Sequence, residues 1–600
     1  MPTVLSYSKA GDIFLSESKY INLIFFSGLF GMFIAVYTYF KFLSTRNYKF
    51  SISITACDLA LFIYCLYLVL NTYGLRETIN EERLIIICFC YLNYILLKTV
   101  FKDIDFKKAL FLLFSGLMLL SIMECLIGCL QYYNILPSLN EYFLVTGTFK
   151  NPAPLALFLS ACYPLSLGII LFSKDTVLRT ISIVNLILTI YVLFLTENRA
   201  SWMAIFIISF VAVQLRFKFL QKLFLIKKSF SLRSFMLAAT AFIILFFIVS
   251  GIYNYKPGSA DSRFLIWKIT SSKLSDRIFF GFGYGSFKEN YNKWQIEYFQ
   301  SNPEILNERY FSSHSASDIA GYVKMAYNEY LEILIEQGLV GFILFISLIV
   351  TALYTGISSL KKTFSPFIIS AILSLISILI TALVSYPFYS IPTFLIFFIL
   401  LAIVSNESQD KSIIWVEFVK PGFIKILCAF LLIASVGVVS VNYQRRNDYH
   451  RYLQAKIAFN RNDLNAIDLF ASLYPNLGAN PNYLLDYGRC LLANGKDTAA
   501  LRTLMKAEKL DSNPTILIMI GNLFKNRKEY SLSEEYYIKA DLTTPSTIYP
   551  KYLLVKLYIL TGQREKSMKM IDKILRAKLK VKNEFSNSII AEIKALKMRK

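Results

Sequence analysis

The sequence predicts an all-α, polytopic membrane protein of about twelve transmembrane helices, with a large extramembrane loop and a C-terminal helical repeat region. Three observations lead to this class. Hydrophobic residues make up 56% and charged residues only 17% of the 600 residues, and the mean hydropathy is +0.50. About twelve apolar runs approach the ~20 residues that a helix needs to cross a bilayer, and the C-terminal part repeats itself. This composition excludes an ordinary soluble globular protein.

The predicted spans are apolar runs bounded by charged or turn-forming residues. In chain order they are Tyr20 to Leu43, Ile52 to Leu70, Leu84 to Leu97, Ala109 to Tyr133, Leu155 to Phe172, Val177 to Leu195, Ser201 to Leu215, Ser234 to Tyr253, Gly338 to Ile357, Pro366 to Ser385, Ile391 to Val404 and Phe423 to Val441.

Short basic loops set the predicted orientation. Residues 41–50, 98–108 and 216–233 are rich in Lys and Arg and follow the first, third and seventh spans, whereas the loop 71–82 after the second span is acidic. Because short positively charged loops stay in the cytoplasm, the basic loops are predicted to be cytoplasmic. The large loop at 254–332 and both termini are then predicted to lie outside the cytoplasm.

Three regions follow from this layout. Residues 1–19 form an N-terminal extracytoplasmic segment, which lacks the pattern of a cleavable signal peptide. Residues 20–444 form the transmembrane domain, which includes the polar and aromatic loop 254–332. Residues 445–600 form the C-terminal region.

The C-terminal region contains an internal repeat. Residues 480–512 and 513–546 align with a period of ~33 to 34 residues, and Gly488 and Gly521 occupy equivalent positions. The pattern resembles a tetratricopeptide array, in which stacked helix pairs leave a concave surface that binds protein partners. The alternative is a helical bundle without a binding role. Lys and Arg number 28 and Asp and Glu 15 in residues 445–600, which suits anionic lipid headgroups or an acidic partner. Nucleic acid is not an expected partner, because the region is predicted to face away from the cytoplasm.

Cysteine and histidine usage predicts neither a metal site nor a cofactor. Eight of the nine cysteines lie in apolar spans, and Cys490 is alone in the C-terminal region. His314 and His450 are the only histidines. No spacing typical of thiolate or imidazole metal ligands is present.

Four polar stretches are predicted to meet on the outer face. They are "GTFKNPAPLALFLSACYP" from Gly147, "LTENRASWMA" around Arg199, "DSRFLIWKITSSKLSDRIFFGFGYGSF" from Asp261 and "AYNEYLEILIEQGLVG" from Ala326. Each stretch stands at the mouth of an apolar run or in the large loop, where polar side chains meet the membrane surface.

Together these stretches resemble the O-antigen ligase and polymerase family, which includes bacterial protein O-oligosaccharyltransferases. That family carries a G-x-F-x-N-P turn, an arginine at the outer mouth of a mid-chain span, an R-x-x-x-W motif followed by G-x-G-x-G-x-F, and an H-N-x-x-L…E-x-G-x-x-G helix entry. The matching region is 147–341 in this sequence. Each motif is weak alone, but the four occur in the family's order.

The resemblance implies a metal-independent transfer of a glycan from undecaprenyl diphosphate to a hydroxyl of lipid A core or of a protein. Arginine offers a permanently charged fork that matches phosphate oxygens. Arg199 and Arg263 are therefore the expected donor-binding and transition-state-stabilising residues. The alternatives are an interfacial anchor for Arg199 and an ordinary solvated cation for Arg263.

The remaining expected site residues also follow from the resemblance. Tyr327 stands where the family has histidine, and a phenol with a pKa of about 10 is a poor general base. His314 or Glu329 is the alternative base, and Asn328 completes the expected catalytic set. Asn328, Glu329 and Glu336 are otherwise explained as helix-entry residues, and the glycines as a plain tight turn. The expected substrate-binding residues are Asn151, Trp267, Gly281, Gly283, Gly285 and Glu336.

Three functions remain open from the sequence. The first is a ligase or protein oligosaccharyltransferase in the bacterial inner membrane, with the repeat region meeting a protein partner. The second is a glycan polymerase of the same family. The third is a lipid-linked glycan flippase or other transporter, which is disfavoured because Asp58 and Glu124 are nearly the only ionisable residues inside the predicted spans.

Overall fold

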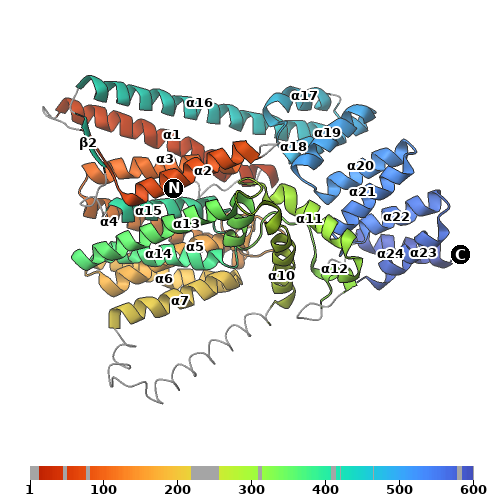
Figure 1. Ribbon diagram of the computed structural model, residues 1–600, viewed down its shortest axis with the longest axis horizontal. Helices are drawn as coiled ribbons and strands as arrows, with labels where there is room; N and C mark the ends of the chain where they lie inside the picture. The colour runs from red at the N-terminus through yellow and green to blue at the C-terminus, as the bar shows by residue number, and fades with distance from the viewer. Residues whose placement is uncertain are drawn as a thin grey trace, which may run out of the picture.

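The chain forms a bundle of long helices joined at one end to an arc of shorter helices (Figure 1). The computed structural model describes residues 12–44, 50–75, 82–217, 254, 256–307, 314–406, 414–418, 421–463, 465–577 and 584–598. Apart from one two-stranded sheet, the regular structure of these residues is helical. The all-α class is therefore confirmed.

Eleven apolar helices build the bundle. Before the large loop they are α1 (Asp12–Ser44), α2 (Ala56–Leu75), α3 (Glu82–Asp103), α4 (Phe106–Tyr132), α5 (Pro152–Phe172), α6 (Thr176–Leu195) and α7 (Arg199–Phe217). After it they are α13 (Glu329–Lys362), α14 (Pro366–Ala382), α15 (Ile391–Asn406) and α16 (Pro421–Asn460). These are the bundle helices within the described ranges.

Nine of these helices are long and apolar enough to cross a membrane, counting only described residues. The helices α14 and α15 are apolar but shorter, with 17 and 16 residues. Every residue of α15 is buried, so this helix packs against protein along its whole length. The predicted span Ser234 to Tyr253 lies outside the described residues. The predicted number of twelve is therefore not confirmed, although a polytopic membrane protein is.

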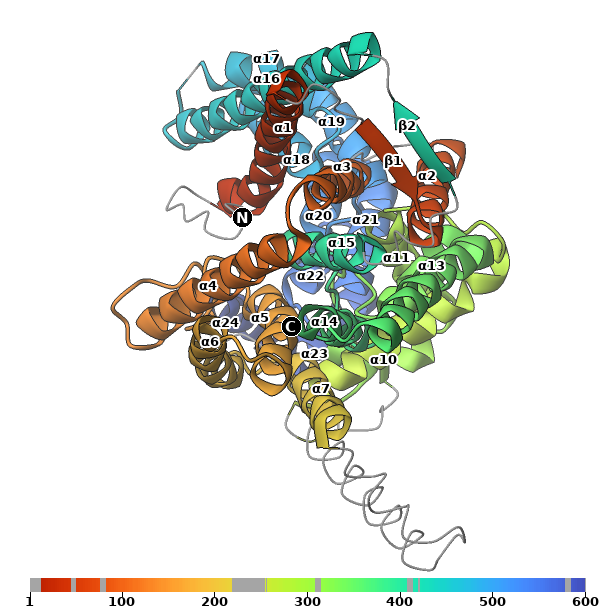
Figure 2. The ribbon, with the colours of Figure 1, turned by 90° about the vertical axis from the view of Figure 1, so that its left-hand side faces the viewer.

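Two groups of helices pack side by side in the bundle (Figure 2). One group contains α1, α16, α3, α15, α2 and α13; the other contains α4, α5, α6, α7 and α14. Helix α5 lies at the centre of the second group and is buried along most of its length. In the first group, α1 approaches α16 closely at Gly28, where a Cβ would lie 2.8 Å from Val439 Cγ2. Small residues permit such close packing of apolar helices.

A short antiparallel sheet marks the end of the bundle opposite the large loop. Strands β1 (Phe50–Ile54) and β2 (Ile414–Phe418) pair with Phe50 opposite Phe418 and Ile54 opposite Ile414. Next to this sheet, Asp58 forms an ion pair with Lys98 at 2.5 Å. The lysines and arginines of the predicted cytoplasmic loops that are described, such as Lys41, also lie at this end.

The large loop folds as a small helical layer beyond the bundle. It contains α10 (Pro257–Ser272), α11 (Phe287–Ser301) and α12 (Ala316–Ile319), with 3₁₀ turns at Leu274–Arg277 and Pro303–Asn307. This layer lies between the bundle and the C-terminal helices in Figure 1.

The C-terminal region is a stack of antiparallel helix pairs. Its helices are α17 (Ala466–Leu477), α18 (Pro481–Ala493), α19 (Asp497–Leu510), α20 (Pro514–Asn526), α21 (Tyr530–Thr543), α22 (Tyr549–Leu560), α23 (Arg564–Arg576) and α24 (Glu584–Met598). Gly488 and Gly521 each allow the two helices of a pair to approach closely. A Cβ at Gly488 would lie 2.7 Å from Leu504, and a Cβ at Gly521 would lie 2.6 Å from Tyr537. The 33-residue period thus reflects a repeated close approach of the paired helices.

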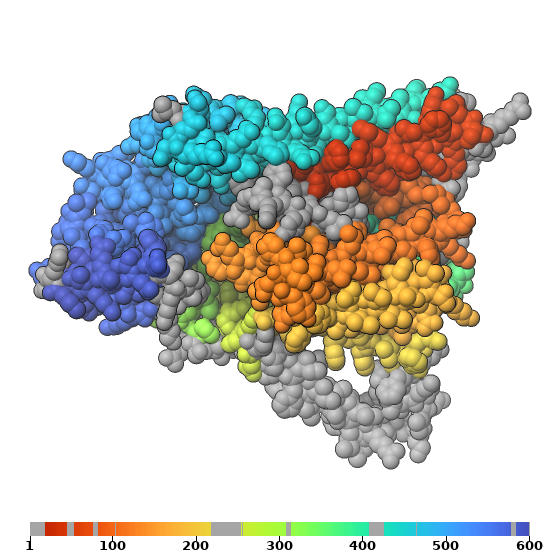
Figure 3. Space-filling model, turned by 180° about the vertical axis from the view of Figure 1, so that it is seen from behind, coloured from red at the N-terminus to blue at the C-terminus, as the bar shows by residue number. Residues whose placement is uncertain are grey.

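The predicted domain boundary at residue 445 falls inside a continuous helix. Helix α16 runs from Pro421 to Asn460, and in Figure 3 it passes along the upper edge of the molecule from the bundle into the repeat region. An apolar span and an amphipathic repeat helix can share one helix because both satisfy their backbone hydrogen bonds internally. The repeat region is therefore attached to the bundle without a linker at this point.

Candidate functional site

Arg199 stands at the first position of α7, in a tight turn that reverses the chain after α6. Glu197 has a φ of 51°, and the Asn198 side chain accepts a hydrogen bond from Ser201 N at 3.0 Å. Asn198 thereby caps the helix. The turn holds Arg199 at the end of the bundle that faces the loop helices, where Lys256 forms an ion pair with Glu197.

Arg263 approaches Arg199 from the loop helix α10. Burial, and then the positive charge of Arg199, lower the pKa of the Arg263 guanidinium from its ordinary value. Among the described residues, no carboxylate forms an ion pair with Arg263. Its guanidinium carbon instead lies 5.3 Å from the centre of the Tyr327 ring. Arg199 and Arg263 thus come together from different parts of the chain, and no carboxylate of the described residues neutralises Arg263. This arrangement suits an anionic ligand.

Tyr327 lies under Arg263 in an uncommon backbone conformation. Its φ is 55°, a left-handed value that a bulky side chain rarely adopts and that often marks a functional position. The ring packs edge-to-face against Tyr386, with centroids 5.3 Å apart. Burial raises the pKa of the Tyr327 phenol, although Arg263 opposes the shift. The phenol is thus protonated at neutral pH and unsuited to act as a general base.

The residues on either side of Tyr327 are fixed by hydrogen bonds. Trp267 Nε1 donates to Ala326 O at 2.9 Å, and Asn328 accepts from Leu331 N at 3.0 Å as the N-cap of α13. Arg263 and Trp267 are one turn apart on α10, so both face the same segment. The R-x-x-x-W spacing is explained by this pairing, in which Trp267 holds the backbone and Arg263 covers the ring.

The G-x-F-x-N-P turn forms a separate polar cluster at the start of α5. Asn151 caps this helix by accepting from Ala153 N at 3.0 Å. The fully buried carboxylate of Glu124 accepts from Thr148 N at 2.9 Å, and a Cβ at Gly147 would overlap that carboxylate. The Asn151 side-chain oxygen is therefore used within the protein as a helix cap.

The three glycines after α10 pack against the backbone that leads into the next span. Gly281 has a φ of 69°, and a Cβ there would overlap the carbonyl of Glu336. Gly283 N donates to Glu336 O at 2.8 Å, and the Glu336 carboxylate accepts from Gly285 N at 2.9 Å and Phe287 N at 2.8 Å. These N–H groups are bonded to Glu336, which favours the tight-turn interpretation over a phosphate-binding loop.

The predicted start of the ninth span at Gly338 corresponds to a kink inside α13. Gly338 has φ 66° and ψ −170°, which is not helical. Leu339 N then donates to Ile278 O at 2.8 Å instead of to its own helix. The segment Glu329–Gln337 is therefore a helical extension beyond the predicted span, and it carries three carboxylates toward the interior.

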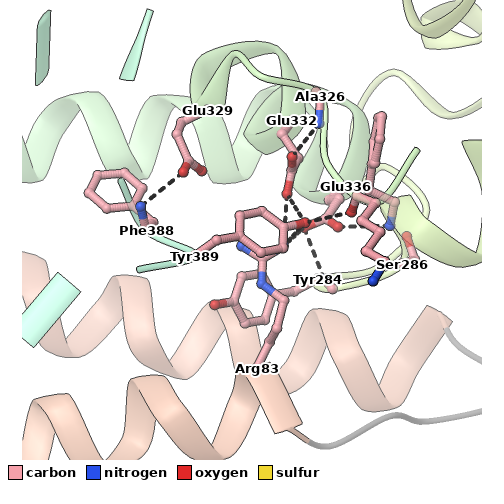
Figure 4. Close-up of polar contacts among 12 residues, drawn as sticks. Arg83, Tyr284, Ser286, Ala326, Glu329, Glu332, Glu336, Phe388 and Tyr389 are labelled. Carbon is pink, nitrogen blue, oxygen red and sulfur yellow. Dashed lines mark hydrogen bonds and ion pairs between the residues drawn. The ribbon is translucent and has the colours of Figure 1, made fainter. Parts of the chain in front are cut away.

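Two of those carboxylates, Glu332 and Glu336, lie beside Arg83, which projects from the first turn of α3 (Figure 4). Arg83 Nη1 lies 2.8 Å from Glu332 and 3.4 Å from Glu336. Tyr389 OH donates to Glu332 at 2.6 Å, and the Arg83 guanidinium lies over the Tyr389 ring at 4.1 Å. The cluster ties α3, α13 and the α14–α15 connection together at the end of the bundle that carries Arg199.

Glu329 belongs to the same helical turn but points to a different partner. Its carboxylate accepts from Phe388 N at 2.9 Å (Figure 4). A cavity of about 30 Å³ lies between these carboxylates and the rings of Phe388 and Phe397. Such a cavity holds about one water molecule and not a sugar. Glu329 and Glu336 both accept hydrogen bonds from backbone N–H groups of the protein, and their expected roles in catalysis and substrate binding stay predictions.

His314 lies on the other side of α10 from Arg263. Its Nδ1 is 4.0 Å from the fully buried Asp261, and its ring lies beside Gly258. Asp261 and Arg263 are two residues apart, which separates them by about 200° around a helix. Tyr327, which stands where the family has histidine, lies on the face of α10 that carries Arg263. The position of His314 therefore does not support the interpretation that it substitutes in space for the family histidine.

The repeat region holds the loop layer in place. Gln295 Nε2 on α11 donates to Leu542 O at 3.0 Å and Thr543 O at 2.9 Å. Lys288 on the same helix forms an ion pair with the buried Asp511 at 2.8 Å. The repeats therefore contact the loop that carries Arg263 through polar groups at the start and in the middle of α11.

Four residues of this region are absent from the set expected from the sequence: Arg83, Glu332, Tyr386 and Tyr389. Two signals were available. Arg83 is an arginine at the mouth of an apolar run, as Arg199 is. Glu332 shares one helical face with Glu329 and Glu336 through its spacing. The two tyrosines lie in the short connection 383–390 and carry no signal there, because their partners come from distant elements.

Residues 184–346 match the model of the O-antigen ligase family. The match begins within α6 and ends within α13, so that it contains Arg199, Arg263 and Tyr327. No curated protein sequence matches the chain. The repeat helices lie outside the match, and their resemblance to tetratricopeptide repeats stays a prediction. The segment that brings the two arginines and Tyr327 together is thus similar to the O-antigen ligase family, and the match supports a membrane glycan transferase of that kind.

Proposed function

We propose that this protein transfers an oligosaccharide from a polyprenyl diphosphate carrier to an acceptor hydroxyl, with undecaprenyl diphosphate as the bacterial carrier. The observation that carries the proposal is the convergence of Arg199 and Arg263. Like charges repel in a partly desolvated site, and among the described residues Arg263 has no carboxylate to offset this. A diphosphate that bridges the two guanidinium groups would remove the repulsion.

In the proposed step, the acceptor hydroxyl attacks the anomeric carbon of the donor sugar. The bond between that carbon and the diphosphate oxygen breaks, the diphosphate keeps the electron pair, and the hydroxyl proton is released to water. Arg199 and Arg263 neutralise the charge that develops on the leaving oxygen, a role in which fixed cations are most effective. Tyr327 positions Arg263 through its ring and takes no proton.

The proposed orientation places this chemistry outside the cytoplasm. Basic residues gather at the opposite end of the bundle, including Lys41, Lys102, Arg216 and Lys362 at helix termini. Positive loops favour the cytoplasmic side. The loop layer and the repeat region would then face the periplasm of a bacterial inner membrane, where a protein partner of the repeats or a membrane-bound acceptor would be reached.

The positions of the buried charges favour surface chemistry over transport. Asp58 is bonded to Lys98 at one end of the bundle, and the Arg83 cluster closes the other end. Transport proteins typically carry ionisable groups and broken helices near the membrane midplane. The unwound position at Gly338 lies at the surface end of α13, beside the loop layer.

The proposal is tested by deleting the gene in its host and complementing it with variants. Lipopolysaccharide and glycoproteins are profiled together by gel and mass spectrometry. Arg263→Ala and Arg199→Ala are expected to reduce glycan transfer by about 10²- to 10³-fold each, the usual effect of removing a transition-state charge partner. The matched control is Arg277→Ala, which removes an exposed arginine of the same loop.

The products identify the acceptor. Loss of long glycans from lipopolysaccharide, with normal glycoproteins, indicates a lipid A core acceptor, and the reverse indicates a protein acceptor. A ladder that stops after one unit indicates a polymerase. Full glycan transfer by the double variant Arg199→Ala/Arg263→Ala would overturn the proposed role of the pair.

A further inference from the structure

A second cleft opens where the bundle meets the repeat region, away from the two arginines. It measures about 550 Å³ and lies between α1, α3, α11, α16, α17 and α18. Pockets for organic ligands in proteins have volumes of roughly 300–1,000 Å³. The cleft lies at the same end of the bundle as the candidate site, because Glu82 and Arg83 are neighbours at the start of α3.

The side chains that line this cleft are mostly polar. Two carboxylates, Glu82 and Asp448, are balanced by two cations, Lys288 and Arg445. Asparagine and glutamine amides fill much of the remaining wall, with two tyrosines: Asn476, Asn480, Asn482, Gln444, Tyr20 and Tyr449. The wall therefore offers many hydrogen-bond donors and acceptors and no net charge.

Parts of the wall are already ordered. Arg445 donates to the Tyr20 hydroxyl, and Asn476 Nδ2 donates to Asp448 at 2.9 Å. Asn482 is exposed on the first turn of α18, which Asn480 caps. Side chains that are held before a ligand arrives lose less entropy when it binds. This favours a binding surface over a loose, water-filled crevice.

The chemistry of the cleft selects among ligand classes. A lipid chain requires an apolar wall, and a phosphate would meet Glu82 and Asp448. A helical peptide requires an apolar groove and an extended peptide an open strand edge, and this cleft supplies neither. A neutral ligand with many hydroxyl groups and apolar C–H faces fits this wall. Its hydroxyl groups can bond the amides and the balanced charges, and its C–H faces can pack on the tyrosine rings.

We propose that this cleft binds a saccharide chain, namely the glycan of the acceptor that the enzyme extends or decorates. This inference rests on the proposed transferase function. The cleft adjoins the Arg83 cluster through Lys288, next to Phe287, and through Glu82, next to Arg83. The repeat region therefore contributes directly to acceptor binding, through the first turn of α18 and the end of α16.

Photo-crosslinking in living cells tests the cleft directly. The full-length protein carries p-benzoylphenylalanine in place of Gln444 or of Asn482, both exposed and on the cleft wall. The control replaces Lys569, which is exposed on α23. We expect an adduct at the two cleft positions that is sensitive to periodate and contains hexose or hexosamine masses. An adduct of protein or phospholipid alone, or none, overturns the proposal.

Two further measurements separate this inference from the proposed function. The saccharide adduct is expected to persist in an Arg263→Ala background, because the cleft does not include that residue. Loss of the adduct there would contradict a separate cleft. The double variant Gln444→Ala/Asn482→Ala is expected to raise the acceptor concentration needed for half-maximal transfer by about three- to tenfold, the effect of one or two neutral hydrogen bonds. An unchanged acceptor dependence would overturn the proposal, even if Arg263 proves essential.

Discussion

Asp511 of the repeat region accepts hydrogen bonds from the hydroxyl of Tyr322 in the large loop, at 2.8 and 2.6 Å to its two oxygens. Asp511 is only 1% exposed, and Tyr322 precedes Tyr327 by five residues. Burial and the neighbouring carboxylate raise the pKa of Tyr322, so the phenol stays protonated and keeps donating. A repeat helix and the segment that carries Tyr327 are thus coupled by a buried, charge-assisted contact.

Removing this contact is expected to loosen the loop. Tyr322→Phe leaves the Asp511 carboxylate with one partner fewer, a loss of about 1.5–3 kcal/mol for a bond to a charged group. Hydrogen exchange should increase at residues 320–327. Asp511→Asn should have a similar effect, and the double variant should add little to it. Tyr142→Phe, at an exposed tyrosine, serves as the control. Strictly additive effects of Tyr322→Phe and Asp511→Asn would show that the two residues are not coupled.

The role of Tyr327 is expected to depend on its ring and not on its hydroxyl. Tyr327→Phe keeps the face that Arg263 covers and should retain transfer within about threefold. Tyr327→Ala removes a cation–π contact of up to ~2 kcal/mol and should lower transfer by about tenfold or more. Because burial raises the pKa of Tyr327, wild type and Tyr327→Phe should share one pH–rate profile from about pH 6 to 9. A basic limb present only in the wild type would assign the phenol a proton-transfer role.

The interlocked glycines are expected to be intolerant of any side chain. At Gly281 and Gly338 the φ angles are 69° and 66°, and a Cβ would overlap the backbone of Glu336 or Phe279. Gly281→Ala and Gly338→Ala should each destabilise the protein by at least about 2 kcal/mol, from the left-handed backbone and the overlap. The readout is the thermal midpoint of the purified protein in detergent. Gly321→Ala, with open space around it, should leave the midpoint unchanged, and equal midpoints for all three variants would contradict this packing.

The Arg83 cluster is expected to be structural. Arg83→Ala leaves Glu332 and Glu336 buried without their cation, which costs about 3–5 kcal/mol when one partner of a buried pair is removed. Arg179→Ala, at an exposed arginine of α6, should change the thermal midpoint little. Because the loss of stability comes from buried carboxylates without a cation, adding Glu332→Gln to Arg83→Ala should recover part of the lost stability. A double variant as unstable as the sum of the single ones would refute this explanation.

The proximity of the expected site residues was predictable where the spacing along one helix carried the signal. The Arg263–Trp267 spacing on α10 brings one side chain to Tyr327 and the other to its preceding residue, and Arg199 at a span mouth lies close enough to Arg263 to lower its pKa. The roles of the glycines and of Glu336 could not be predicted in the same way. Whether a backbone N–H meets a ligand or a carboxylate depends on which distant segment packs against it.

Hydropathy and the distribution of charge along the chain determined the class of this protein, the positions of its apolar helices and the repeat, because these patterns depend on neighbours within one or two helical turns. Only the tertiary structure decided that α16 joins the bundle and the repeats, that Arg83 pairs with Glu332 and Glu336 of α13, and that the repeats reach the loop through Asp511. Such contacts join residues hundreds of positions apart, and their free energy depends on desolvation and geometry that arise only when the helices pack.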